Sequence, residues 1–168
     1  MARELCAAIA EKIDHQVDRV LRMCSLVPAD RAGWQPPIPR PITFGQLFTH
    51  LCECLAGFAA TLQAARPAEL EHLSRLKALL ATPCASVADA ADRLGQLRAA
   101  IAEGFGVLTD EDLPRRIPTV FVKEGEPILT LLLINLEHLA SHKYQLFVYL
   151  RLAGVSVESR DLYHFSGA

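Results

Sequence analysis

Two histidines four residues apart occupy the stretch of this chain most suited to chemistry. His138 and His142 lie in its most apolar part, and Asn135, Gln145 and Tyr149 continue a spacing of three or four residues. At helical periodicity these five side chains form one polar line on a single face. Because burying an imidazole or an amide without a partner costs about 1–3 kcal/mol, this line needs hydrogen bonds, water or a metal ion.

A third histidine can reach the same place from another predicted helix. His50 lies beside a core-facing stripe, and Glu53 and Cys54 follow it on the same side. Three neutral imidazoles from two helices would bind one ion and leave coordination positions open, as in catalytic zinc sites. The alternative is a metal-free network in which His138 and His142 hydrogen-bond to polar neighbours, namely Glu53, Asn135 and Gln145. The spacing alone leaves both interpretations open.

Other side chains near these histidines are candidates for ligand contacts or pocket walls. Glu53 is expected to accept a hydrogen bond from His50 or to face solvent. Cys54 is either a small buried hydrophobe or a thiolate ligand for a soft metal. Cys52 lies on the other side of the helix and does not chelate together with Cys54. Pocket walls are expected from three further residues, Asn135, Gln145 and Tyr149.

Four long amphipathic helices must position these groups. The hydrophobic spacing predicts helices over residues 3–27, 43–65, 86–103 and 126–153, with a shorter one between Pro67 and Pro83. Gly104 and Gly106 are expected to end the third long helix, and Gly154 the last. The pattern predicts one all-α domain over residues 1–168, an antiparallel four-helix bundle with long crossover connections and one short extra helix.

The remaining segments are predicted to be connections. Residues 28–41 carry five prolines and form a crossover, in which Trp34, the only tryptophan, caps the core or lines a pocket mouth. Residues 109–127 are irregular and contain a β-like run, Val120 to Val122, that permits a small hairpin. Residues 155–168 are expected to pack as an extended arm, and His164 within them has no site role.

The composition restricts the function classes. Seventeen Lys and Arg against nineteen Asp and Glu leave a formal charge of -2, so binding to nucleic acid is not expected as the main activity. The longest apolar run, residues 128–134, is too short to span a membrane, and the start lacks the hydrophobic run of a signal peptide. We therefore expect a cytoplasmic protein with five reduced cysteines and no membrane partner.

Two segments resemble signatures of the DinB/YfiT-like superfamily of metal-binding four-helix bundles. The first comprises Trp34-Gln-Pro and Thr43-Phe-Gly-Gln-Leu-Phe-Thr-His50-Leu-Cys-Glu, and the second runs from His138 to Gly154. The resemblance implies that a divalent metal, usually zinc or nickel, is bound by His50, His138 and His142. The chain departs from the common closing pattern at positions 141, 143 and 144, where it has Ser, Lys and Tyr instead of a further His and Arg-Gly.

The resemblance also implies a kind of chemistry. Characterised relatives include thiol-dependent transferases, which use low-molecular-weight thiols such as mycothiol or bacillithiol, and a maleylpyruvate isomerase. The resemblance implies a metal-dependent transferase, hydrolase or isomerase, in which the metal activates a thiol or water for attack on a small-molecule substrate. The alternative is a non-enzymatic, stress-related metal-binding bundle. Relatives often dimerise, so a homodimer is expected under either reading.

Overall fold

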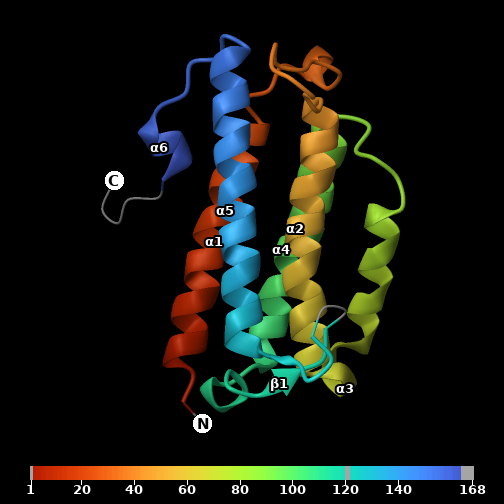
Figure 1. Ribbon diagram of the computed structural model, residues 1–168, viewed down its shortest axis with the longest axis vertical. Coiled ribbons are helices and arrows are strands. Elements are labelled where there is room, and N and C mark those ends of the chain that lie inside the picture. The colour runs from red at the N-terminus through yellow and green to blue at the C-terminus, as the bar shows by residue number, and fades with distance from the viewer. Residues whose placement is uncertain (1, 120–121, 164–168) are drawn as a thin grey trace.

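Four long helices form the body of the protein. The computed structural model describes residues 2–119 and 122–163. Helices α1 (Glu4–Cys24), α2 (Phe44–Ala65), α4 (Val87–Val107) and α5 (Ile128–Leu152) lie side by side (Figure 1), and α1 contacts α4, α4 contacts α2, α2 contacts α5, and α5 contacts α1. The prediction of an all-α bundle is confirmed.

The directions of the helices differ from the antiparallel arrangement that the sequence predicts. In Figure 1, α1 and α5 ascend, whereas both α2 and α4 descend, so the neighbouring helices α2 and α4 are parallel. The intervening segment, α3 (Pro67–Leu70) followed by a 3₁₀ helix over Glu71–Leu80, returns the chain to the upper end before α4 begins. The antiparallel arrangement is therefore wrong for α2 and α4.

The return segment is the shorter helix predicted between Pro67 and Pro83, and over Glu71–Leu80 it has the 3₁₀ form. Leu70, Leu73, Leu76 and Leu79 recur every three residues and pack against the core. A strict three-residue repeat keeps these leucines on one face of a helix with three residues per turn, whereas an α-helix would rotate them apart. The local leucine spacing therefore favours the 3₁₀ conformation.

The starts of two long helices follow the predicted capping residues. The Thr43 hydroxyl accepts from the Gln46 backbone N–H (3.1 Å), and the Gln46 side chain accepts from the Thr43 N–H (2.8 Å). Ser86 accepts from the Asp89 backbone N–H in the same way at the start of α4. These side chains satisfy backbone donors that the first turn of a helix leaves unpaired.

The end of α4 corrects the sequence reading. The helix continues through Gly104 to Val107, although the two glycines were expected to terminate it. A Cβ atom at Gly104 would lie 2.8 Å from Cβ of Leu62 on α2. Gly104 therefore permits close approach of two helices and is not a helix stop. At the end of α5, in contrast, Gly154 has a φ of +81° and ends the helix as expected.

The connections close the two ends of the bundle. The crossover over residues 25–43 contains only a short 3₁₀ turn (Ala29–Arg31) among regular elements, and Trp34 within it stacks on Phe44 with ring centroids 5.1 Å apart. Trp34 therefore caps the core. At the other end, β1 (Arg116–Ile117) and β2 (Glu126–Pro127) form a two-stranded antiparallel hairpin that pairs Arg116 with Pro127. Val120 and Phe121 of the predicted β-like run lie outside the described residues.

The C-terminal arm contains one more helical turn than expected. Helix α6 (Ser159–Leu162) follows Glu158, and Leu162 is buried against the bundle. The backbone N–H of Glu158 donates to Asp161, which stabilises the turn. His164 lies outside the described residues.

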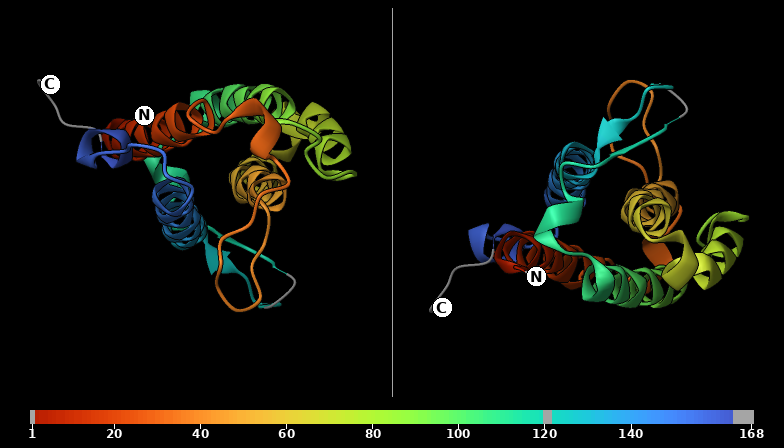
Figure 2. Two further views of the ribbon diagram at one scale, coloured as in Figure 1. Left: turned by 90° about the horizontal axis from the view of Figure 1, so that it is seen from above. Right: turned by 90° about the horizontal axis from the view of Figure 1, so that it is seen from below.

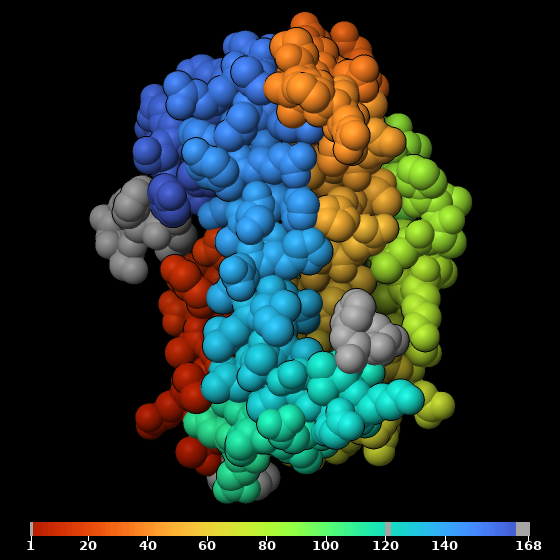
Figure 3. Space-filling model, viewed as in Figure 1, coloured from red at the N-terminus to blue at the C-terminus, as the bar shows by residue number. Residues whose placement is uncertain are grey.

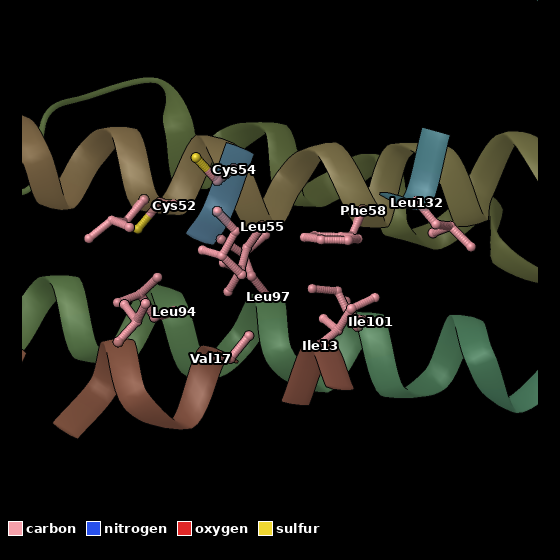
Figure 4. Close-up of a cluster of buried hydrophobic side chains, with 14 of the residues drawn as sticks. Ile13, Val17, Cys52, Cys54, Leu55, Phe58, Leu94, Leu97, Ile101 and Leu132 are labelled. Carbon is pink, nitrogen blue, oxygen red and sulfur yellow. The ribbon is translucent and has the colours of Figure 1, made fainter. Parts of the chain in front are cut away.

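A continuous apolar core fills the space between the long helices. Figure 4 shows Leu55 and Phe58 of α2 facing Leu97 and Ile101 of α4. No helix within residues 2–119 and 122–163 is long and apolar enough to cross a membrane.

Candidate metal centre

Three histidines from α2 and α5 form one compact cluster. Each of His50, His138 and His142 offers a ring nitrogen, and these nitrogens all lie within 4.8 Å of one another. In the part of the chain that the structure describes, no other group of three His, Cys, Asp or Glu side chains meets this test. Figure 1 shows why the cluster forms, since α2 and α5 run side by side over this stretch.

Two of the imidazoles are oriented by neighbours on their own helix. Nδ1 of His50 lies 2.7 Å from the Glu53 carboxylate, and Nδ1 of His142 lies 2.8 Å from Oε1 of Gln145. A carboxylate oxygen and an amide oxygen accept hydrogen bonds, so in both rings Nδ1 carries the proton. In the neutral form of each ring, the lone pair is then on Nε2.

The two Nε2 atoms face each other across the helix contact. Nε2 of His50 lies 3.0 Å from Nε2 of His142. Two lone pairs at this distance repel unless a proton or a cation lies between them. Because zinc binds imidazole nitrogen at about 2.0–2.1 Å, both atoms can bind one ion. The donor set therefore fits a divalent transition metal.

His138 completes the group from the solvent side. Its ring centroid is 5.1 Å from that of His50 and 4.8 Å from that of His142, and its Nδ1 lies 3.8 Å from Sγ of the buried Cys54. Partial burial lowers the pKa of His138, and the two neighbouring imidazoles lower it further, which favours the neutral, ligating form. Burial in an apolar setting raises the pKa of Cys54 to about 12, so this thiol is a neutral neighbour in the metal-free protein.

The cluster lies at the edge of the α2–α5 contact and not in the core. His138 is exposed, and His50 and His142 are half-buried. The apolar surroundings in the sequence suggested burial, but Ile134, one helical turn before His138 on α5, is itself about half exposed, at 51 %. A bound ion would therefore remain accessible to small molecules.

A chain of contacts connects the cluster to the capped end of the core. Gln145 donates from Nε2 to the Tyr149 hydroxyl at 3.3 Å, and the Tyr149 ring packs edge-on against Trp34 at 6.3 Å between centroids. Gln145 thus contacts His142, a candidate ligand, directly, while Tyr149 contacts Gln145 and Trp34 packs against Tyr149.

Asn135 belongs to a neighbouring groove. Its side chain donates to the Thr61 hydroxyl at 3.2 Å and lies against Gly57, and these two partners on α2 are two to three turns beyond His50. Together with Ile134 these residues line a depression of about 760 Å³ between α2, α5 and the hairpin segment. Figure 3 shows this face, with α2 and α5 side by side, the crossover above and the hairpin below.

The burial of Lys143, the residue that follows His142, was not predicted from the sequence. Lys143 is 4 % exposed and donates to Oε1 of Gln16 and to the backbone oxygen of Leu162, both at 2.7 Å. Burial and the charges of Lys12 and Arg19 lower its pKa to about 8. Its position could have been foreseen, because it shares the core-facing stripe of α5 with three leucines, Leu139, Leu146 and Leu150.

An all-α bundle with three histidines on two facing helices defines the class of protein. A family model described as the DinB superfamily matches residues 12–146. The chain therefore belongs to the DinB superfamily, as its resemblance to the two signatures predicted.

Solved structures agree with this assignment at the level of the fold. The chain is similar to a DinB-like protein from Bacillus subtilis, with 18% identity, a TM-score of 0.69, and coverage of 89% of this chain and 94% of the other. A DinB-like protein from Bacillus cereus gives 18% identity, a TM-score of 0.70, and coverage of 89% and 93%. No curated protein matches.

Proposed function

We propose that this protein is a divalent-metal-dependent enzyme in which three histidines, His50, His138 and His142, bind zinc or nickel. The observation that carries the proposal is the 3.0 Å approach of two Nε2 atoms whose rings are both oriented by acceptors on Nδ1. When bound, such an ion lowers the pKa of a coordinated thiol or water and promotes its attack on an electrophile.

The side chains around the cluster have separate tasks in this proposal. Glu53 and Gln145 hold two rings in the tautomer that presents Nε2. The exposed His138 leaves the solvent side open, which suits an exchangeable thiol cofactor such as mycothiol or bacillithiol. The open arrangement favours transferase, hydrolase or isomerase chemistry over a closed structural site.

The groove beside Asn135 offers space for a small-molecule substrate. It has a volume of about 760 Å³, within the range of ligand pockets, and it begins one helical turn from His138. Its walls combine small residues of α2 such as Gly57 and Ala60 with apolar residues of α5 such as Ile134. A substrate with an apolar portion would lie there while its electrophilic carbon faces the histidines.

Elemental analysis of protein purified without an affinity tag tests the metal site. We expect close to one equivalent of zinc or nickel in the wild type, loss of this metal on chelation, and less than about a tenth of an equivalent in His138→Ala. His72→Ala, which removes an exposed histidine paired with Glu103, is the matched control and should retain the metal. Metal below about a tenth of an equivalent in the wild type as well would contradict the proposal.

A second measurement separates an enzyme from a passive metal protein. Mycothiol, bacillithiol and other low-molecular-weight thiols would be tested for transfer to a model electrophile, before and after chelation. We expect transfer that depends on metal and is lost in His138→Ala. A metal-loaded protein without activity towards any thiol or water substrate would favour the alternative below.

A non-enzymatic, stress-related dimeric bundle is the second candidate. The observation that favours it is the outer face of α5, where Leu133 and Tyr144 lie three helical turns apart and are 47 % and 55 % exposed. Apolar residues that are exposed together on one helix commonly mark an interface. Sedimentation analysis of the wild type and of a Leu133→Asp, Tyr144→Asp double variant tests this, since a homodimer through α5 would dissociate in the variant.

A further inference from the structure

Three buried cysteines gather at the upper end of the bundle, apart from the histidines. Cys24 of α1, Cys52 of α2 and Cys84 in the loop before α4 are free thiols, exposed by 0, 1 and 6 %. Figure 4 shows Cys52 on the side of α2 that faces α4, whereas Cys54 points to the other side. These three sulfurs do not form a metal-binding group of the kind that the histidines form, in the part of the chain that the structure describes.

Cys52 and Cys84 are brought together by a backbone contact. The N–H of Cys84 donates to the Thr49 hydroxyl at 2.8 Å, and Thr49 lies one helical turn before Cys52 on the same face of α2. Thr49 in turn donates to the Gly45 backbone at 3.0 Å, which fixes its rotamer. The loop is therefore held against α2 at the level of Cys52, and the two thiols, Cys52 and Cys84, are neighbours in the buried core.

The surroundings of Cys84 favour reaction at this thiol. The neighbouring Cys52 thiol, with Thr49 and the Arg93 guanidinium, lowers the pKa of Cys84 to about 7, against the opposing effects of its burial and of Asp89. Arg93 is itself held in place by the backbone oxygens of Leu79 and Thr82, both at 2.7 Å.

A thin layer of chain separates Cys84 from solvent. Its neighbours Pro83 and Ala85 are exposed, and the loop over residues 81–86 is the short connection into α4. Cys84 is accordingly the most exposed of the three thiols, at 6 %. Cys24 and Cys52, in contrast, lie on long helices inside the core.

We propose that Cys52 and Cys84 form a disulfide-forming pair that is oxidised by hydroperoxides, with Cys84 as the attacking thiol. The Cys84 sulfur attacks one oxygen of the hydroperoxide, the O–O bond breaks, and an alcohol or water leaves as Cys84 becomes a sulfenic acid. The Cys52 sulfur then attacks the sulfenic sulfur, and the hydroxyl leaves as water with the thiol proton. The two thiols lose two electrons in total, and the hydroperoxide gains them.

The bond would join the loop before α4 to the end of α2 that carries a candidate metal ligand. Cys52 is two residues from His50, on a different face of the same helix turn. The proposal does not depend on metal binding, because neither sulfur belongs to the histidine cluster.

Thiol counting on the full-length reduced protein tests the pair. After treatment with a few equivalents of hydrogen peroxide and alkylation under denaturing conditions, we expect three alkylated cysteines in place of the five in the sequence. Without alkylation, the intact mass should fall by about 2 Da, which corresponds to the loss of two hydrogens. Peptide mapping should join the tryptic peptide that contains Cys84 to the one that contains Cys52.

Matched variants make the assignment specific. Cys84→Ala should keep all its remaining thiols after peroxide, whereas Cys54→Ala and Cys24→Ala should still form the bond; Cys54→Ala also leaves Cys52 as the only cysteine in its tryptic peptide. Mapping of the wild-type protein keeps the proposal testable if a variant fails to fold. Five alkylated thiols after peroxide, a bond that persists in Cys84→Ala, or oxidation of Cys84 without a bond would each overturn the proposal.

Discussion

Helix α2 meets two neighbours through faces of opposite chemistry. Towards α4 it presents large apolar side chains, and Leu62 packs directly over Gly104. Towards α5 it presents His50, Glu53 and Gly57, whose contacts are imidazoles and an amide. Both faces belong to the same helix, so the difference in polarity comes from the side chains on each face and from the helix that each face meets.

The comparison separates the residues that hold the bundle from those available for chemistry. Apolar burial scales with the area removed from water, so fully buried side chains at the α2–α4 contact, such as Leu55, Phe58 and Leu97, contribute strongly to the free energy of unfolding. Half-exposed polar pairs contribute little to stability. The edge of the α2–α5 contact can therefore carry a ligand set at small cost to the fold, and Figure 2 shows that the crossover and the hairpin both project past this side of the bundle.

The largest effect is expected from a substitution that disrupts the apolar contact between α2 and α4. Leu62→Ala should lower the free energy of unfolding by about 2–5 kcal/mol, because it leaves a cavity where α2 meets α4. Urea denaturation monitored by circular dichroism measures this. The metal content of the folded fraction should stay unchanged.

The matched change on the other face is His138→Ala, which removes the metal in the experiment above. Without metal, its free energy of unfolding should differ from that of the wild type by less than about 1 kcal/mol, since the side chain is exposed. If Leu62→Ala abolished metal binding in the folded state, or if metal-free His138→Ala were as unstable as Leu62→Ala, the two contacts would not be separable.

Two glycines allow a smaller, sharper test. A Cβ at Gly104 would lie 2.8 Å from Cβ of Leu62, which moves only with its backbone, whereas a Cβ at Gly57 would lie 2.8 Å from the movable end of Asn135. Gly104→Ala should therefore destabilise the protein by about 1–3 kcal/mol. Gly57→Ala should be within about 1 kcal/mol of wild type, because the gain in helix propensity offsets the loss of the Asn135 hydrogen bond. Equal destabilisation in thermal unfolding would contradict the comparison.

The smallest effect is expected at Glu53, whose carboxylate orients the His50 ring. Glu53→Gln keeps an acceptor for Nδ1 of His50 but removes its charge, so the ring becomes a weaker base and metal affinity should fall about tenfold. Competition with a chromophoric chelator measures this affinity. Glu137→Gln removes the same charge from an exposed residue next to His138 and should change the affinity less than about twofold. An equal loss in both variants would mean that only the overall charge matters.

Much of the local structure could be predicted because it depends on neighbours in the chain. Thr43 and Ser86 start their helices through contacts with residues three positions later. His138 and His142 share a face of α5 because four residues make about one helical turn. Glu53 and Gln145 lie next to their histidines for the same reason.

What the sequence by itself determined was therefore which residues share a helix face, and the tertiary structure decided what each face meets. The register of α2 against α5 places Nε2 of His50 3.0 Å from Nε2 of His142 and takes Asn135 away to Thr61. Because α2 and α4 run parallel, Gly104 packs against Leu62 and does not end its helix as expected. The same arrangement brings Cys84 close to Cys52. Helical periodicity constrains positions within one element only, whereas the direction and offset of two elements follow from the packing of all their side chains together.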